Sequence, residues 1–259
     1  RSRNKEEIIE EAKYLIKNGY QEIVLTGIHV GGYGQDLENC SFSSLVDELS
    51  NLENLKSLRI SSIEESEIDD HLINLINTRK SIAKHLHIPL QSGSNTVLER
   101  MNRKYTREEF IAKIDYIKSL MPDLMITTDI IVGFPNETED EFLSSLEAAK
   151  HCFNMIHVFP YSAREGTFAA KMNNQIDPRI KAERTSRLIE LSSKLWNEYC
   201  SSYIGTYQDV LIEKYDKEEN ANIGHTSNYL LIKIPSELPK IGKFINVKIE
   251  KELIESKEK

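Results

Sequence analysis

The chain has 259 residues, of which 33 are basic and 41 acidic, so its formal net charge is −8. Hydrophobic residues make up 39% of it and charged residues 29%, which is typical of a globular protein. No apolar run approaches the roughly 20 residues that a membrane helix needs, and no signal peptide is recognisable, so we expect a cytoplasmic protein with no membrane partner. The three cysteines, Cys40, Cys152 and Cys200, are too far apart to indicate a disulfide framework or a metal site.

The charge is unevenly distributed along the chain. Residues 36–78 carry ten acidic and two basic side chains, whereas residues 79–118 carry nine basic and four acidic ones. A local anion-binding face is therefore compatible with an acidic chain. Solvated helix faces without a partner would explain the same distribution equally well.

Apolar, strand-like runs alternate with amphipathic helices over the first 204 residues. The predicted helices begin at capping residues, such as Thr106 with Glu109 and Asp177 before Pro178. The predicted strands are residues 22–26, 57–61, 85–90, 125–133 and 155–161. This alternation predicts βα units around a parallel sheet.

The number of strands limits the architecture. The first predicted element is a helix with no strand before it, and five strands fall short of the eight in a complete (β/α)₈ barrel. We therefore expect an α/β fold in which residues 1–204 form a partial parallel barrel that lacks its first strand. After Gly205 only short strand-like segments follow, at residues 209–214, 229–234 and 244–250, which predicts a small all-β barrel over residues 205–259. Residues 252–259 are expected to be a frayed tail.

The stretch from His85 to Ser94 lies at the centre of this organisation. Its apolar run ends in Gln91, Ser92 and Gly93, a segment that can turn the chain and leave backbone N–H groups free for a ligand. A strand that leads through such a loop into a helix is where parallel α/β folds place their ligands. We expect the polar loops after the other strands to converge on the same site.

The loop motifs occur in a characteristic order. They are Thr26-Gly-Ile-His-Val-Gly-Gly-Tyr-Gly34, Ser61-Ser-Ile-Glu64, Pro89-Leu-Gln-Ser-Gly-Ser94, Thr128-Asp-Ile-Ile-Val-Gly-Phe-Pro135 and His157-Val-Phe-Pro-Tyr-Ser162. Together they resemble the loops of the radical-SAM tRNA methylthiotransferases. Residues 205–259 resemble the TRAM domain, a tRNA-binding module. Within them, Gly224-His-Thr-Ser-Asn-Tyr-Leu230 resembles the branch that acts on threonylcarbamoyladenosine.

This resemblance implies a reaction and its cofactors. The reaction would convert N6-threonylcarbamoyladenosine at position 37, in the anticodon loop of tRNA, to its 2-methylthio derivative. It would use S-adenosyl-L-methionine and [4Fe–4S] clusters, with an electron donor as a further partner. The CxxxCxxC cluster motif of the family is absent here, so we assign no metal ligand and no catalytic residue to this chain. We expect a fragment of a larger enzyme that is inactive without its cluster-binding segment.

The resemblance also implies which residues bind S-adenosylmethionine. They are Thr26, Gly27, Ser61, Glu64, Gln91, Ser92, Arg103, Ile131, Val132, His157 and Phe159. Backbone acceptors at Thr26 and Gly27 suit the amino group, and Arg103 suits the carboxylate.

Each assignment has a structural alternative. Thr26 and Gly27 would also serve only to turn the chain, and Ser61 and Glu64 would cap the next helix. Arg103 is equally well a surface cation. Two further sets have their own alternatives. Ile131 and Val132 are favoured as plain core, and His85, His87 and His157 as satisfied core histidines rather than bases or metal ligands.

The residues assigned to RNA binding are Tyr161, Arg164, His225, Asn228 and Tyr229. An aromatic ring with amide donors can stack on and hydrogen-bond an unpaired base. Alternatively, Tyr161 and Arg164 pack the mouth of the barrel, and the segment around Asn228 is only a tight turn.

Three other functions stay open at this point. One is a tRNA-binding fragment without catalysis, and another is a methylthiotransferase of the isopentenyladenosine branch. An unrelated aldolase-like barrel enzyme would need a Schiff-base lysine at a strand end, and none of the predicted strands contains a lysine.

Overall fold

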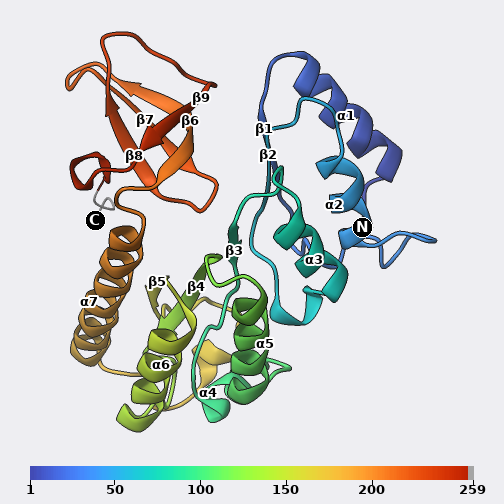
Figure 1. Cartoon of the computed structure of the whole chain (residues 1–259). Coiled ribbons are helices and arrows are strands. Elements are labelled where there is room, and N and C mark those ends of the chain that lie inside the picture. The colour runs from blue at the N-terminus through green and yellow to red at the C-terminus, as the bar shows by residue number, and fades with distance from the viewer. Residues whose placement is uncertain (256–259) are drawn as a thin grey trace. The chain divides into compact units, whose positions relative to one another are not determined.

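The computed structural model describes residues 1–255 and shows a mixed α/β chain (Figure 1). It forms two compact units. Of the described residues, the first unit comprises 1–86, 123–125 and 200–255, and the second comprises 87–122 and 126–199.

All five strands predicted for the α/β part are present, in two sheets. The strands are β1 (Glu22–Leu25), β2 (Ser57–Ile60), β3 (His85–His87), β4 (Met125–Val132) and β5 (Met155–Pro160). β1 pairs with β2 in parallel, and the second sheet has the order β3-β4-β5, in which β4 and β5 are parallel. The prediction of a parallel α/β fold is confirmed.

Helices alternate with these strands as predicted. They are α1 (Lys5–Lys17), α2 (Phe42–Ser50), α3 (Asp70–Thr78), α4 (Asn95–Arg100), α5 (Arg107–Leu120), α6 (Glu139–Cys152) and α7 (Pro178–Ser202). The predicted cap of α5 is present, because Thr106 Oγ1 accepts from the Glu109 N–H while the Glu109 carboxylate accepts from the Thr106 N–H. No helix within residues 1–255, including the long α7, is apolar enough over a sufficient length to cross a bilayer.

The core of the second unit lies on one face of β4. Ile130 and Val132 are completely buried, whereas Asp129 and Ile131, which point to the other face, are partly exposed. Both α5 and α6 contribute completely buried aromatic rings, Phe110 and Phe142, and the two helices pack against each other. The sheet therefore has one buried face and one partly exposed face.

A side chain of α7 forms hydrogen bonds with the backbone of β5, an edge strand of this sheet. The Ser192 hydroxyl, on α7, accepts from the Ile156 N–H and donates to the Ile156 carbonyl, both at 2.9 Å. An edge strand would otherwise leave these two groups unpaired.

The C-terminal region is all-β, as predicted, but its strands differ from the prediction. It has β6 (Tyr207–Asp216), β7 (Ala221–Thr226), β8 (Leu231–Pro235) and β9 (Phe244–Lys248), in the antiparallel order β8-β7-β6-β9, and the sheet is curled (Figure 1). β7 was not predicted from the sequence, because glycine is typical of turns and Gly224 lies in the middle of this strand. In the structure Gly224 lies within β7, where a Cβ atom would be 1.8 Å from the Leu211 carbonyl oxygen.

The C-terminal tail is also more ordered than expected. Lys251–Leu253 form a 3₁₀ turn, and Ile254 forms a β-bridge with Ile232. The prediction of a frayed tail is therefore wrong for residues 252–254, and residues 256–259 lie outside the described part of the chain.

A buried ion pair joins α7 to the loop that follows β4. Arg184 Nη1 donates to Glu137 Oε2 at 2.7 Å, and the two side chains are only 5% and 1% exposed. The same carboxylate oxygen accepts from the Gly133 N–H at 2.7 Å, and Arg184 also donates to the Glu137 carbonyl at 3.0 Å. Burial raises the pKa of Glu137, while Gly133 and Arg184 oppose this effect.

Replacing Arg184 by methionine should destabilise the protein by about 3 kcal/mol, because it leaves the Glu137 carboxylate buried without its cation. The matched control is R187M. Arg187 lies on the same helix as Arg184, its side chain is 34% exposed, and its loss removes ion pairs with Glu139 of α6 and Glu183 of α7, so the variant should cost less than about 1 kcal/mol. Urea unfolding of both variants measures the difference, and equal losses would contradict this role of the buried pair.

Candidate functional site

The partly exposed face of β4 and β5 carries several of the predicted cofactor residues. In the parallel register Asp129 pairs with His157 and Ile131 pairs with Phe159, so these four side chains share one face. We call this surface the open face. Phe159 is 50% exposed, and His157 is exposed as well. The interpretation of His157 as a core histidine is therefore wrong.

The predicted adenine slot of Ile131 and Val132 is not brought together. Ile131 lies on the open face, whereas Val132 is completely buried on the opposite face. The two residues are adjacent in sequence, and adjacent residues of a strand point to opposite sides. This placement favours the interpretation of Val132 as core.

Gln91 and Ser92 follow β3 but differ in accessibility. Gln91 has φ +66°; its N–H donates to the Asp129 carbonyl, and its carbonyl accepts from the Ile131 N–H. This holds Gln91 beside the middle of β4, with its side chain partly exposed. Ser92 is completely buried, and its hydroxyl lies 3.3 Å from that of Ser145 on α6.

His87 and Asp129 were not singled out as site residues by the sequence. His87 Nε2 lies 3.2 Å from Asp129 Oδ1, and Nδ1 lies 2.9 Å from Thr127 Oγ1. The rings of His87 and His157 are 5.5 Å apart. The available signal was a charged residue, Asp129, within a strand that is otherwise free of charge.

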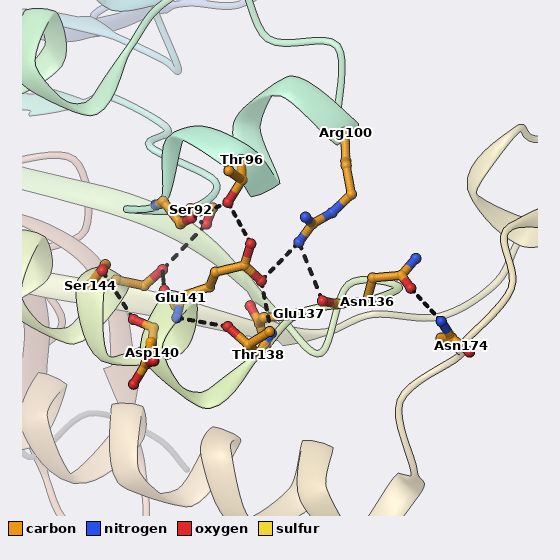
Figure 2. A network of polar contacts seen from close by, with 12 residues as sticks. Ser92, Thr96, Arg100, Asn136, Glu137, Thr138, Asp140, Glu141, Ser144 and Asn174 are labelled. Carbon is orange, nitrogen blue, oxygen red and sulfur yellow. Dashed lines mark hydrogen bonds and ion pairs between the residues drawn. The ribbon is translucent and has the colours of Figure 1, made fainter.

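The loop after β4 is held by charged hydrogen bonds (Figure 2). Glu141 accepts from Arg100 Nη2 at 2.9 Å, from the Thr138 N–H at 2.7 Å and from the Thr96 hydroxyl. Burial raises the pKa of Glu141, but these hydrogen bonds outweigh that effect and lower it to about 2. The loop is thereby fixed at the carboxyl end of β4.

Tyr161 closes the end of β5. Its N–H donates to the Val132 carbonyl at 2.8 Å, and its ring packs edge-on against Phe134. Lys181 Nζ lies 5.4 Å from the ring centroid and donates to the Tyr161 carbonyl. The Tyr161 hydroxyl is buried and has no hydrogen-bond partner within residues 1–255.

Arg103 and Arg164, the two cationic residues predicted to bind a ligand in the second unit, differ in exposure. The Arg103 N–H closes α4 by donating to the Leu98 carbonyl, and its side chain is partly buried. Arg164 is exposed in the loop after β5, where its carbonyl accepts from the N–H and the hydroxyl of Thr167. Arg164 is thus accessible to a substrate.

In the first unit, the predicted residues gather at the carboxyl ends of β1 and β2. Thr26 and Gly27 are exposed and line an open cavity of about 860 Å³, whose wall also includes apolar residues of α1 and α2. The Ser61 N–H donates to the Leu25 carbonyl, so Ser61 ends β2 beside the end of β1. Glu64 occupies the N-cap position of a 3₁₀ turn (Glu65–Glu67), where its N–H donates to Glu67 Oε2.

The segment predicted to bind RNA is a tight turn between β7 and β8. The Tyr229 N–H donates to the Thr226 carbonyl, and Tyr229 has φ +67°. Asn228 is buried, with its Oδ1 accepting from the Thr226 hydroxyl at 2.5 Å. These contacts match the turn that the sequence offered as the alternative.

Both faces of the Tyr229 ring are covered within the first unit. His85 stacks on it at 4.4 Å and His225 at 4.7 Å between ring centroids, and the Arg59 guanidinium lies 5.3 Å away. Arg59 also donates to the Thr226 carbonyl at 3.2 Å. A base could therefore stack on Tyr229 only after displacing an imidazole, so the geometry gives Tyr229 a packing role.

No metal centre is formed by the described residues. Within residues 1–255 no three His, Cys, Asp or Glu side chains are arranged to hold a metal ion, and none of the three cysteines forms a disulfide; two of them are buried. This part of the chain does not fit an iron–sulfur cluster. In contrast, the amide of Gln91 and the accessible surfaces of Ile131 and Phe159 suit a nucleoside, which needs polar contacts to its ribose and apolar contacts to its base.

Comparisons with known proteins agree with this arrangement. Residues 1–149 match the family model of the radical SAM superfamily, and residues 201–252 match that of the TRAM domain. The chain is 48% identical, over 97% of its length, to the threonylcarbamoyladenosine tRNA methylthiotransferase of Bacillus subtilis, and covers 57% of that protein. It is 41% identical, over 96% of its length, to the tRNA-2-methylthio-N(6)-dimethylallyladenosine synthase of Thermoanaerobacter pseudethanolicus, of which it covers 54%.

Among solved structures, coproporphyrinogen III oxidase from Escherichia coli, a radical SAM enzyme, has the same fold. Its TM-score is 0.55 at 18% identity, over 74% of this chain and 44% of the oxidase. The chain thus spans a little over half the length of the curated relatives that it matches.

Replacing Tyr229 by alanine should lower the free energy of unfolding by about 2 kcal/mol, because the ring is packed between two imidazoles. The control is Y207A, which removes a tyrosine of β6 that is 68% exposed and should change stability by less than about 0.5 kcal/mol. Thermal unfolding of both variants checks this, and two equally stable variants would refute the packing role.

Proposed function

Since the chain belongs to the radical SAM superfamily and carries a TRAM domain, we propose that it is part of a tRNA methylthiotransferase acting on N6-threonylcarbamoyladenosine. The observation that carries the proposal is the 48% identity to the Bacillus subtilis enzyme of that name, over almost the whole of this chain. The reaction would convert the adenosine at position 37, in the anticodon loop, to its 2-methylthio derivative.

The second candidate is methylthiolation of an isopentenyl-type adenosine. Its support is the 41% identity to a dimethylallyladenosine synthase over 96% of the chain. The two candidates differ in the substituent on N6 of the adenosine, which is polar in one and apolar in the other. The proposed site of modification, C2 of the purine, is the same in both.

In this proposal the chain binds and orients the substrates rather than the cluster. Bound S-adenosylmethionine together with an iron–sulfur cluster would supply the one-electron chemistry that replaces C–H by C–SCH₃. Thr26, Gly27 and Ser61, at the ends of β1 and β2, would hold polar groups of S-adenosylmethionine.

The cluster ligands would lie outside residues 1–255, since this part of the chain offers none. An external electron donor would then be a partner of the complete enzyme, and the 259-residue chain alone would not turn over. The TRAM domain would contact the tRNA through phosphates and unpaired bases, in the cytoplasm.

The test uses the complete enzyme with its clusters rebuilt under anaerobic conditions. We expect it to form the 2-methylthio nucleoside on tRNA that carries threonylcarbamoyladenosine, as measured by mass spectrometry of the digested tRNA, and to leave isopentenyladenosine unmodified. The control is the 259-residue chain treated in the same way, which should form neither product nor 5′-deoxyadenosine. Product on isopentenyladenosine alone would support the second candidate instead, and product on neither tRNA would overturn both.

A further inference from the structure

The loop between β5 and α7 carries an exposed aromatic ring. We call residues 161–177 the rim loop, because they follow β5 at the carboxyl edge of its sheet. Phe168 lies in the rim loop and is 78% exposed, more than any other phenylalanine of the chain. Single exposed apolar side chains are common on protein surfaces, so the ring by itself does not indicate a ligand. Its surroundings decide the question.

The backbone on both sides of Phe168 is held by local hydrogen bonds. The Thr167 N–H donates to the Arg164 carbonyl at 3.2 Å, and Gly166 has φ +84°, as the third residue of a type II turn requires. The Thr167 hydroxyl donates to the same carbonyl at 2.7 Å and accepts from the Ala170 N–H at 3.3 Å. Phe168 itself is the first residue of the 3₁₀ turn that follows.

The second half of the rim loop is anchored by two amide side chains. Gln175 Nε2 donates to the carbonyls of Ala169 and Met172, both at 3.0 Å. Asn174 Nδ2 donates to Asn136 Oδ1 at 2.8 Å, and the Asn136 N–H donates to the Asn174 carbonyl at 3.1 Å (Figure 2). The rim loop is thereby tied to the loop after β4. Its exposed ring is preorganised, so little entropy is lost when a ligand binds.

Two cations lie close to the ring in this loop. Arg164 and Lys171 are exposed, and neither forms an ion pair within residues 1–255. The Lys171 N–H donates to the Phe168 carbonyl at 3.0 Å, so these two residues are one 3₁₀ turn apart. The loop also has two acidic residues. Asp177 caps α7 by accepting from the Arg179 N–H at 2.7 Å, and Glu165 is exposed.

The combination of ring and cations favours one kind of partner. Single-stranded RNA is bound by aromatic rings on which unpaired bases stack, together with cations that contact the phosphates. A protein partner would fit less well, because charged residues are depleted at the centre of protein interfaces, and Phe168 has charged and polar neighbours on both sides. The carboxyl ends of parallel strands are also where α/β folds bind their substrates.

We propose that the rim loop binds the anticodon loop of the tRNA, with Phe168 stacking on an unpaired base and Arg164 and Lys171 contacting phosphates. The inference rests on the proposed function and names a surface that would hold its RNA substrate.

The test measures binding of the whole 259-residue chain to two RNAs by fluorescence anisotropy. One is a stem-loop with an unpaired loop, and the other is a fully paired duplex of the same length. F168A should lose about tenfold in affinity for the stem-loop, which is the usual effect of removing one base–aromatic stack, and should bind the duplex as the wild type does. F168W, which keeps a flat ring, should retain the wild-type affinity for both.

The controls separate stacking from charge and from stability. Y116A removes a tyrosine of α5 that is 44% exposed, and it should bind both RNAs as the wild type does. R164A and K171A should each weaken binding to both RNAs and lower the salt dependence of binding by about one ion, since phosphates are present in both. Thermal unfolding of F168A should match the wild type, because the ring is exposed.

Two outcomes would overturn the role of the rim loop while leaving the proposed function standing. They are equal affinity of F168A and the wild type for the stem-loop, and an equal loss by F168A on both RNAs. Failure of the proposed function has a different signature, because the wild-type chain would then bind neither RNA.

Discussion

Successive side chains of β4 point to opposite faces of its sheet, and the two faces are chemically different. Ile130 and Val132 are completely buried, which ties the strand to the hydrophobic core. The same alternation forces Asp129 and Ile131 onto the open face, where the register with β5 adds His157 and Phe159. A shift of one residue would exchange the two faces, so the packing of the core determines which side chains can meet a ligand.

Charged groups hold the parts of the second unit that surround this face. The Glu137–Arg184 ion pair binds α7 to the loop after β4. The Glu141 carboxylate accepts hydrogen bonds from Arg100 of α4 and from the N–H of Thr138, the cap of its own helix. These contacts lie outside the open face and do not compete with a ligand for it. Their role is to keep the carboxyl end of β4 in one conformation, so that less entropy is lost when a ligand binds.

Local signals in the sequence predicted most of the fold. The cap at Thr106 and the apolar strand runs of the α/β part act over a few residues, and they are present in the structure. β7 was missed because Gly224 is required by a close approach to the Leu211 backbone, a contact between strands that no local pattern reveals. The loop around Tyr229 resembles an RNA-binding motif, but whether its ring is free depends on His85, which is far away in the sequence.

The candidate site was predictable only in part, for the same reason. The carboxyl ends of β1 and β2 bring Thr26 and Ser61 to one edge, as parallel pairing requires. The contact between His87 and Asp129 depends on the pairing of two strands almost forty residues apart, and it appears only once the register is known. The sequence identifies the family, whereas the register identifies which side chains share the open face.

The most direct test of this account is an NMR titration of the histidine ring signals with the free nucleoside N6-threonylcarbamoyladenosine. Of the seven histidines, His157 lies on the open face and His87 lies 3.2 Å from its Asp129, so we expect the signals of these two to shift, while those of His71 and His151 stay in place. Unchanged signals from His87 and His157, together with a shift of the His225 signal, would contradict the account and place the nucleoside on the TRAM domain instead.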